Sequence, residues 1–77
     1  MFTLAGGLSQ RQLQIAALIR HGLRNGEIAA RLNLSVGAVA NHVAAILVRL
    51  RLRNRAQVAA WAAEHGLGSE RPDGWQL

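Results

Sequence analysis

Four arginines alternate with other residues in the stretch RLRLRNR, which covers residues 49–55. All nine basic residues of the chain are arginines, and the formal net charge is +5. Guanidinium groups match the geometry of phosphates, so this density of arginine favours a polyanionic partner, either nucleic acid or an anionic membrane surface. The other interpretation is a solvated helix end, where cations suit the helix dipole. A membrane surface is disfavoured, because an alternation of period two gives a helix no continuous apolar face.

The remaining chemical groups do not suggest catalysis or metal binding. The three histidines, His21, His42 and His65, do not occur at metal-ligand spacing, and the few acidic residues do not form a carboxylate pair. We therefore expect neither an enzyme nor a bound metal or cofactor. Cysteine is absent, no apolar run approaches about 20 residues, and the N-terminus lacks the features of a signal peptide. These features predict a cytoplasmic protein without a membrane segment.

A chain of 77 residues is expected to form one small domain. Apolar residues recur at helical spacing, so we predict an all-α fold of four helices. The expected helices cover residues 10–21, 26–32, 36–50 and 55–65. The residues expected to cap them are Ser9, Asn25, Ser35 and Asn54. The domain itself is expected to cover residues 8–67, between a flexible lead-in over 1–7 and a disordered, polar tail over 68–77.

The second and third expected helices form a helix-turn-helix pattern. A short helix is followed by a tight turn and by a longer, capped helix whose first turns can enter the major groove of DNA. Successive residues of a helix turn by about 100°, which separates the long helix into two faces. The expected buried stripe is Val39, Val43, Ile46 and Leu50. The opposite, outward face is expected to contain Gly37, Asn41, Ala44 and Val48.

With its flanks, this pattern resembles the DNA-binding domain of the LuxR family, or GerE type, which quorum-sensing regulators and NarL/FixJ-type response regulators share. The landmarks are LSQR, Gly22, NGEIAARL, Ser35, AVANH, Ile46, Leu50, Arg55 and the closing GL, over residues 8–67. The resemblance implies a four-helix domain that binds double-stranded DNA and regulates transcription. It also implies a recognition role for the third helix and a symmetric dimer contact through the fourth. RNA polymerase or another regulator is a further expected partner.

The chain departs from the family at the recognition helix. The family usually has threonine and lysine where this chain has Ala38 and Ala40, so the outward face carries no formal charge. In one account the domain still binds DNA, with arginines on phosphates and Asn41 paired with adenine. Ala40, Ala44 and Val48 would then pack on thymine methyl groups and favour A·T-rich half-sites. In the alternative account, the uncharged face binds protein, as a dimer seam or as a cap on another regulator.

Two sets of candidate residues follow. The residues expected to contact DNA lie on the recognition helix and at its edges: Arg24, Asn25, Arg31, Ser35, Gly37, Ala38, Ala40, Asn41, His42, Ala44, Val48, Arg49, Arg51 and Arg53. The residues expected at the dimer contact lie on the last helix: Val58, Trp61, Ala62 and His65.

Overall fold

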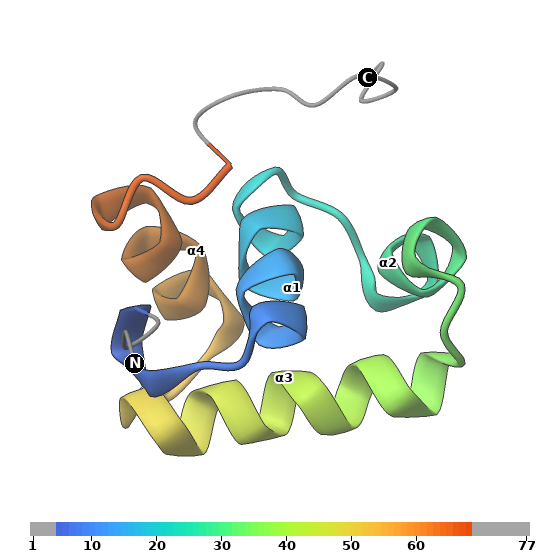
Figure 1. The fold of residues 1–77 in the computed structure, drawn as a ribbon, viewed down its shortest axis with the longest axis horizontal. Helices are drawn as coiled ribbons and strands as arrows, with labels where there is room; N and C mark the ends of the chain where they lie inside the picture. Colours follow the sequence, from blue (N-terminus) through green and yellow to red (C-terminus); the bar gives the residue numbers. More distant parts are fainter. Residues whose placement is uncertain (1–4, 69–77) are drawn as a thin grey trace.

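The computed structural model describes residues 5–68 (Figure 1). It contains a short 3-10 turn, η1, over Ala5–Gly7, followed by the helices α1 Gln10–Arg20, α2 Asn25–Leu32, α3 Val36–Leu50 and α4 Arg55–Glu64. No strand occurs within the described part of the chain. The predicted all-α, four-helix fold is confirmed, and each helix begins and ends within one residue of its expected bounds. Residues 1–4 and 69–77, which hold most of the expected lead-in and tail, lie outside the described residues.

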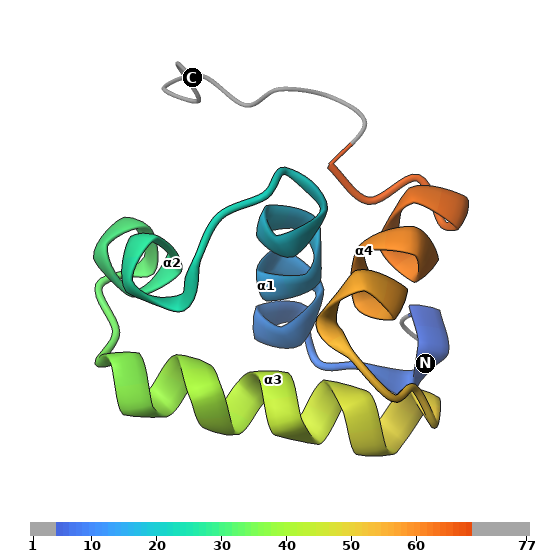
Figure 2. The ribbon, with the colours of Figure 1, turned by 180° about the vertical axis from the view of Figure 1, so that it is seen from behind.

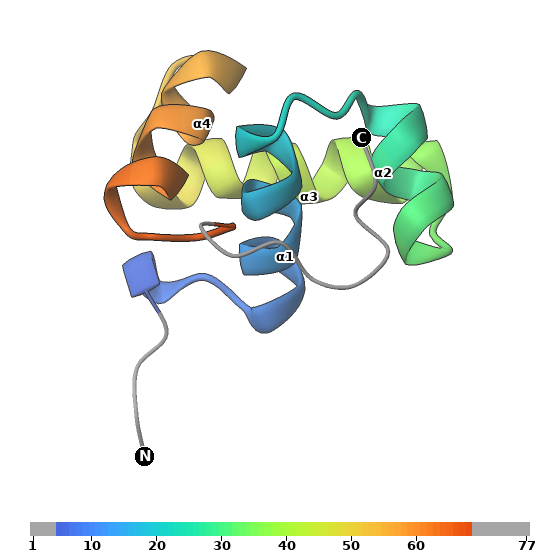
Figure 3. The same cartoon turned by 90° about the horizontal axis from the view of Figure 1, so that it is seen from above.

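The longest helix, α3, lies along one edge of the molecule, and α1, α2 and α4 all lie on the same side of it (Figures 1 and 2). Seen from above, α1 stands between α2 and α4 and crosses over α3 (Figure 3). Helix α1 packs against both α4 and α3, and α2 packs against the other end of α3. One long side of α3 is therefore left without a covering element among the described residues.

Three of the four expected helix caps are confirmed. The Ser9 and Ser35 hydroxyls accept hydrogen bonds from the backbone N–H groups three residues ahead, at 3.1 and 3.0 Å, and the Asn54 side chain does the same at 2.9 Å. These side chains satisfy backbone donors that a helix start leaves without partners. Each cap marks the start of its helix in the sequence.

The start of α2 differs from the prediction, because Asn25 is the first helical residue and not the cap. Arg24 holds the cap position, and its backbone N–H donates to the Glu27 carboxylate at 2.7 Å. The acidic side chain in the first turn thus replaces the expected amide cap and also suits the positive end of the helix dipole. Asn25 is freed from capping and takes a different structural role.

Every helix contributes to one apolar core. Its buried members are Leu8, Ile15, Ala16, Leu18, Ile19, Leu23, Ile28, Ala29, Val39, Val43, Ile46, Val58 and Ala62. Three residues of the expected stripe on α3, Val39, Val43 and Ile46, are buried, whereas Leu50 is only half-buried at the edge of the core. A fully buried aliphatic side chain contributes about 1.5–3 kcal/mol, so this stripe is a main source of stability and holds α3 in place.

Residues 5–7, expected in the flexible lead-in, instead form the turn η1 and pack at the junction of α3 and α4. Gly6 has a φ of +63°, and a Cβ placed there would lie 2.6 Å from Leu50 Cδ2 and 2.7 Å from Trp61 Cζ2. Only glycine allows both this backbone conformation and this close approach. The pair Gly6-Gly7 therefore marks a packed turn and not a loose segment.

A second tie between distant segments involves Arg55 at the start of α4. Its Nη1 donates to Asn25 Oδ1 at 2.7 Å, and its Nη2 donates to the Leu23 carbonyl oxygen at 2.6 Å. Leu23 lies in the connection between α1 and α2, Asn25 is the first residue of α2, and both contacts are partly buried. One side chain thus joins the first helix of the helix-turn-helix to α4.

We expect Arg55→Ala to lower the free energy of unfolding by about 1.5–3 kcal/mol, because a charged donor is lost from two partly buried acceptors. Urea unfolding followed by circular dichroism measures the change. The matched control is Arg53→Ala, which alters an exposed arginine two residues away and should change stability by less than about 0.5 kcal/mol. Equal losses in the two variants would contradict the role of Arg55 as a tie.

Candidate nucleic-acid interface

The helix-turn-helix consists of α2 and α3, whose axes differ in direction by 110°. Asn33 ends α2 in the left-handed conformation, with a φ of 57°, and the Leu34 N–H donates to the Ala29 carbonyl oxygen at 2.9 Å. Asparagine tolerates this conformation better than most residues, so the chain can reverse within a short turn before Ser35 caps α3. The predicted turn at residues 33 and 34 is confirmed, and it sets the angle between the two helices.

The outward side of α3 is exposed along its length and carries no arginine, lysine or acidic residue before Arg49. The exposed residues on this side are Gly37, Ala40, Asn41, Ala44, Ala45 and Val48. The other two exposed residues of α3, Val36 and Arg49, are turned from Val48 by about 120° and about 100° around the helix axis. Val48 is 79% exposed, which is unusual for a large apolar side chain in a helix. The outward placement expected for Gly37, Asn41, Ala44 and Val48 agrees with the structure. Ala38 and His42, expected to contact DNA, lie half-buried at the margin of this face.

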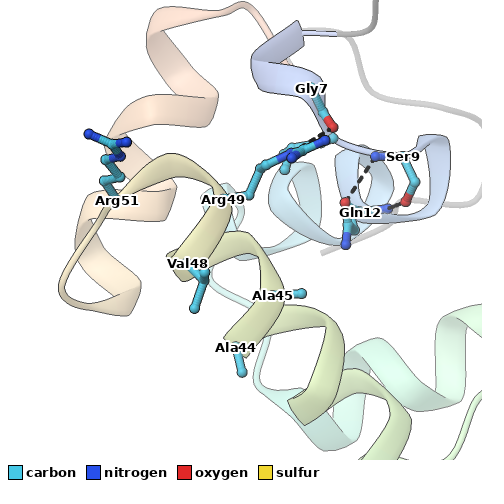
Figure 4. Close-up of a pocket in the computed structure, with 9 residues that line it drawn as sticks. Gly7, Ser9, Gln12, Ala44, Ala45, Val48, Arg49 and Arg51 are labelled. Atoms are coloured by element: carbon cyan, nitrogen blue, oxygen red, sulfur yellow. Dashed lines mark hydrogen bonds between the residues drawn. The ribbon is translucent and has the colours of Figure 1, made fainter.

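An open groove runs beside the second half of α3, where the N-terminus of α1 approaches it (Figure 4). Its lining comes from three segments of the chain: Gly7, Leu8, Ser9, Gln12, Ala44, Ala45, Val48, Arg49 and Arg51. Ala44 and Val48 point to the same side of α3, whereas Arg49 extends toward Gly7 (Figure 4). The sequence analysis did not place Ser9, Gln12 or Ala45 at the outward face of α3. Ser9 and Gln12 could not be placed there, because only the packed fold brings the start of α1 next to α3.

The five arginines expected to hold phosphates are all exposed: Arg24, Arg31, Arg49, Arg51 and Arg53. Arg49 is oriented by a hydrogen bond from its Nε to the Gly7 carbonyl oxygen, at 3.2 Å. Arg51 ends α3 in the left-handed conformation, with a φ of 57°, so the backbone turns and its side chain leaves the helix in a new direction. Arg49 and Arg51 therefore lie at the C-terminal end of the uncharged face, where they line the groove.

This arrangement can be compared with known proteins. Residues 7–62 match the family described as bacterial regulatory proteins of the luxR family. The chain belongs to the LuxR family. Its members are DNA-binding regulators of transcription and not enzymes, so this chain contains a DNA-binding domain of the helix-turn-helix type.

Two relatives show how much of a regulator this LuxR-family domain represents. The transcriptional regulatory protein LnrK of Bacillus subtilis (strain 168) is 37% identical over 60 residues, which are 78% of this chain and 27% of LnrK. The response regulator protein VraR of Staphylococcus aureus (strain Mu3 / ATCC 700698) is 35% identical over 60 residues, again 78% of this chain and 29% of VraR. The chain thus spans less than a third of the length of these relatives.

Two polar residues expected to contact DNA have structural roles in the LuxR-family domain. The Asn25 side-chain oxygen Oδ1 accepts from Arg55, and Asn25 is half-buried, so its side chain is held in place at the start of α2. The Ser35 hydroxyl oxygen accepts from the Ala38 N–H as the cap of α3. Ser35 is exposed and keeps a hydroxyl proton that can be donated, whereas the Asn25 oxygen is already paired.

The expected dimer residues on α4 need a larger correction. Val58 and Ala62 are fully buried in the core, so they cannot form the contact between two subunits. Trp61 is half-buried, and His65 stacks on it with ring centroids 4.2 Å apart. The fully exposed side of α4 instead carries Ala56, Gln57, Ala60, Ala63 and Glu64. Alanines occur all around α4, so periodicity could not identify the inner face.

Residues 5–68 contain no group of three or more histidine, cysteine, aspartate or glutamate residues that could hold a metal ion. Within the same residues, no single helix is long and apolar enough to cross a membrane. Helices α2 and α3 reach such a length and composition only as a pair, and this pair is bent by 110°.

Proposed function

We propose that this LuxR-family domain regulates transcription by placing α3 in the major groove of double-stranded DNA. The observation that carries the proposal is the long exposed side of α3, set at 110° to α2, with Arg49 and Arg51 in the groove beside it. A major groove about 12 Å wide accommodates an α-helix, and small side chains allow this helix to approach the bases closely. The printed names of LnrK and VraR, a transcriptional and a response regulator, support the same role.

Phosphate contacts supply most of the affinity in this proposal. Each exposed arginine beside α3 can replace condensed counterions along the DNA backbone. The described acidic residues, Glu27 and Glu64, lie on α2 and α4, and α3 itself has no acidic residue. Arg49 is oriented for this role, because its Nε is bonded to the Gly7 carbonyl oxygen and its terminal nitrogens can still donate.

We expect Arg49→Ala to weaken binding to all DNA sequences by a similar factor and to lower the slope of log affinity against log salt by about one. Fluorescence anisotropy titrations at several salt concentrations measure this slope. Arg49→Lys keeps the charge and should leave the slope unchanged, which makes it the matched control. A slope that is equal in wild type and Arg49→Ala would show that Arg49 does not contact a phosphate.

Base recognition falls to Asn41 in this proposal. Asn41 is exposed at the middle of the outward face, and its amide can make paired hydrogen bonds with adenine N6 and N7. The neighbouring outward residues have no polar side-chain atoms. Asn41 is therefore the one hydrogen-bonding reader of bases on the outward side of α3 before Arg49.

We expect Asn41→Ala to cost about 1–3 kcal/mol on a selected binding site and to leave binding to random DNA nearly unchanged. Ala40→Lys, which restores a charge at the exposed position beside Asn41, should raise affinity for random DNA. Both changes are measured by the same titrations with selected and random duplexes. If Asn41→Ala has no effect on any duplex and Ala40→Lys abolishes binding of a protein partner, the uncharged face is a protein-binding surface instead.

The domain is also proposed to form a two-fold dimer through the exposed side of α4. Ala56, Ala60 and Ala63 lie at helical spacing on this side, so the α4 helices of two copies can approach closely. A small domain gains stability by burying further surface between subunits. This contact replaces the one expected from the sequence, because Val58 and Ala62 are inside the core.

We expect the domain to associate in a concentration-dependent way and Ala60→Glu to remain monomeric, because each copy would then bring a further carboxylate, one turn from Glu64, into the contact. Sedimentation equilibrium with and without DNA measures the association. Ala30→Glu changes an exposed alanine on α2 and should leave it intact. A wild-type domain that stays monomeric at high concentration under both conditions would rule out this dimer.

A further inference from the structure

We propose that α3 recognises the C5-methyl groups of pyrimidines, and that the domain consequently binds 5-methylcytosine in preference to cytosine. The inference rests on the proposed DNA-binding function and specifies what the uncharged face recognises. It makes cytosine methylation a signal that changes the occupancy of a site by this domain.

The exposed side of α3 presents methyl groups where a DNA-reading helix commonly presents polar or charged side chains. Ala40, Ala44 and Val48 are exposed, and Val48 has the largest exposure of the large apolar residues at 79%. Ala44 and Val48 are one helical turn apart and point to the same side of α3 (Figure 4). Their separation along the helix is about 6 Å, close to two base steps of about 3.4 Å each. The two side chains can thus face two bases of one strand.

An apolar side chain in the major groove distinguishes bases according to whether it shields polar or apolar groups of the base from water. Beside guanine O6 and N7, or beside the amino group of cytosine, it displaces water without replacing the hydrogen bond, which weakens binding. Beside thymine it covers the C5-methyl group, and both apolar surfaces leave water. In 5-methylcytosine a methyl group occupies the same C5 position, so the same side chain gains the same contact.

The surrounding charge indicates DNA, and not an apolar protein, as the occupant of this face. Arg49 and Arg51 lie at the edge of the groove that contains Ala44 and Val48, and no acidic residue lines it. A partner that fits must therefore present negative charge next to methyl groups. The major groove of DNA has both features, with phosphates at its edges and pyrimidine methyl groups on its floor.

The test begins with duplexes selected by the domain from a random pool. Replacing thymine by uracil at single positions removes one methyl group and leaves every hydrogen-bonding group in place. At contacted positions we expect affinity to fall about fourfold, the factor that corresponds to about 0.8 kcal/mol for one buried carbon. Replacing the same thymine·adenine pairs by cytosine·guanine should weaken binding, and 5-methylcytosine there should bind about fourfold more tightly than cytosine.

A pair of valines on the same helix provides the matched control. Val48→Ser should remove the difference between thymine and uracil at one position, whereas Val36→Ser should preserve it. Val36 is 54% exposed but is turned by about 120° from Val48 around the helix axis. Both substitutions are on the surface, and circular dichroism shows that each variant is folded.

The outcomes separate this inference from the proposed function. Salt-dependent DNA binding without any effect of uracil or 5-methylcytosine overturns methyl recognition and leaves the DNA-binding role intact. Absence of DNA binding at low salt overturns both. The inference is also overturned if replacing thymine by uracil lowers the affinity of both Val48→Ser and Ala44→Ser at every position where it lowers that of the wild type. Val48 and Ala44 are then not the side chains that contact the methyl groups.

Discussion

Val39, Val43 and Ile46 pack beneath α1 and α2, and this contact determines how α3 is rotated about its own axis. Each residue of a helix is turned by about 100° from the last, so a shift of one position would move Asn41 from the outward face to its margin. The same packing leaves Val48 in solvent and brings the N-terminus of α1 next to Ala44. The composition of the exposed face thus follows from the residues buried on its opposite side.

Several polar side chains hold the fold through helix caps and through one partly buried contact, which leaves the exposed arginines for binding. Ser9 and Ser35 cap helices, and Asn25 is paired with Arg55. The exposed arginines can then act on phosphates, where attraction depends on salt. Contacts between methyl groups do not depend on counterion release, so in the proposed interface affinity and base discrimination would arise from physically different interactions. A change in salt concentration would therefore alter affinity more than base discrimination.

Helix positions, three of four caps and the buried stripe of α3 could be predicted from the sequence, because they depend on residues close together in the chain. The Arg55–Asn25 tie and the groove between α1 and α3 could not, since they join residues about 30 positions apart that no periodic pattern relates. Helix α4 shows a different limit. Its many alanines make the inner and outer faces chemically alike, so only packing reveals that Val58 is inside and Ala60 is outside.

The difference in binding free energy between a specific site and other DNA is small for a single domain with these contacts. Pairing of two domains is therefore important for specificity. In the proposed interface Asn41 would contribute about 1–3 kcal/mol and each covered methyl group about 0.8 kcal/mol, so one half-site with three methyl contacts would reach about 3–5 kcal/mol. Specific DNA binding typically exceeds non-specific binding by about 4–10 kcal/mol. Two copies on adjacent half-sites reach that range together, because each adds its own discrimination. A recognition helix without lysine or arginine before its last turn therefore depends on a partner domain more than a more highly charged helix does, and the exposed alanines of α4 provide a surface for it.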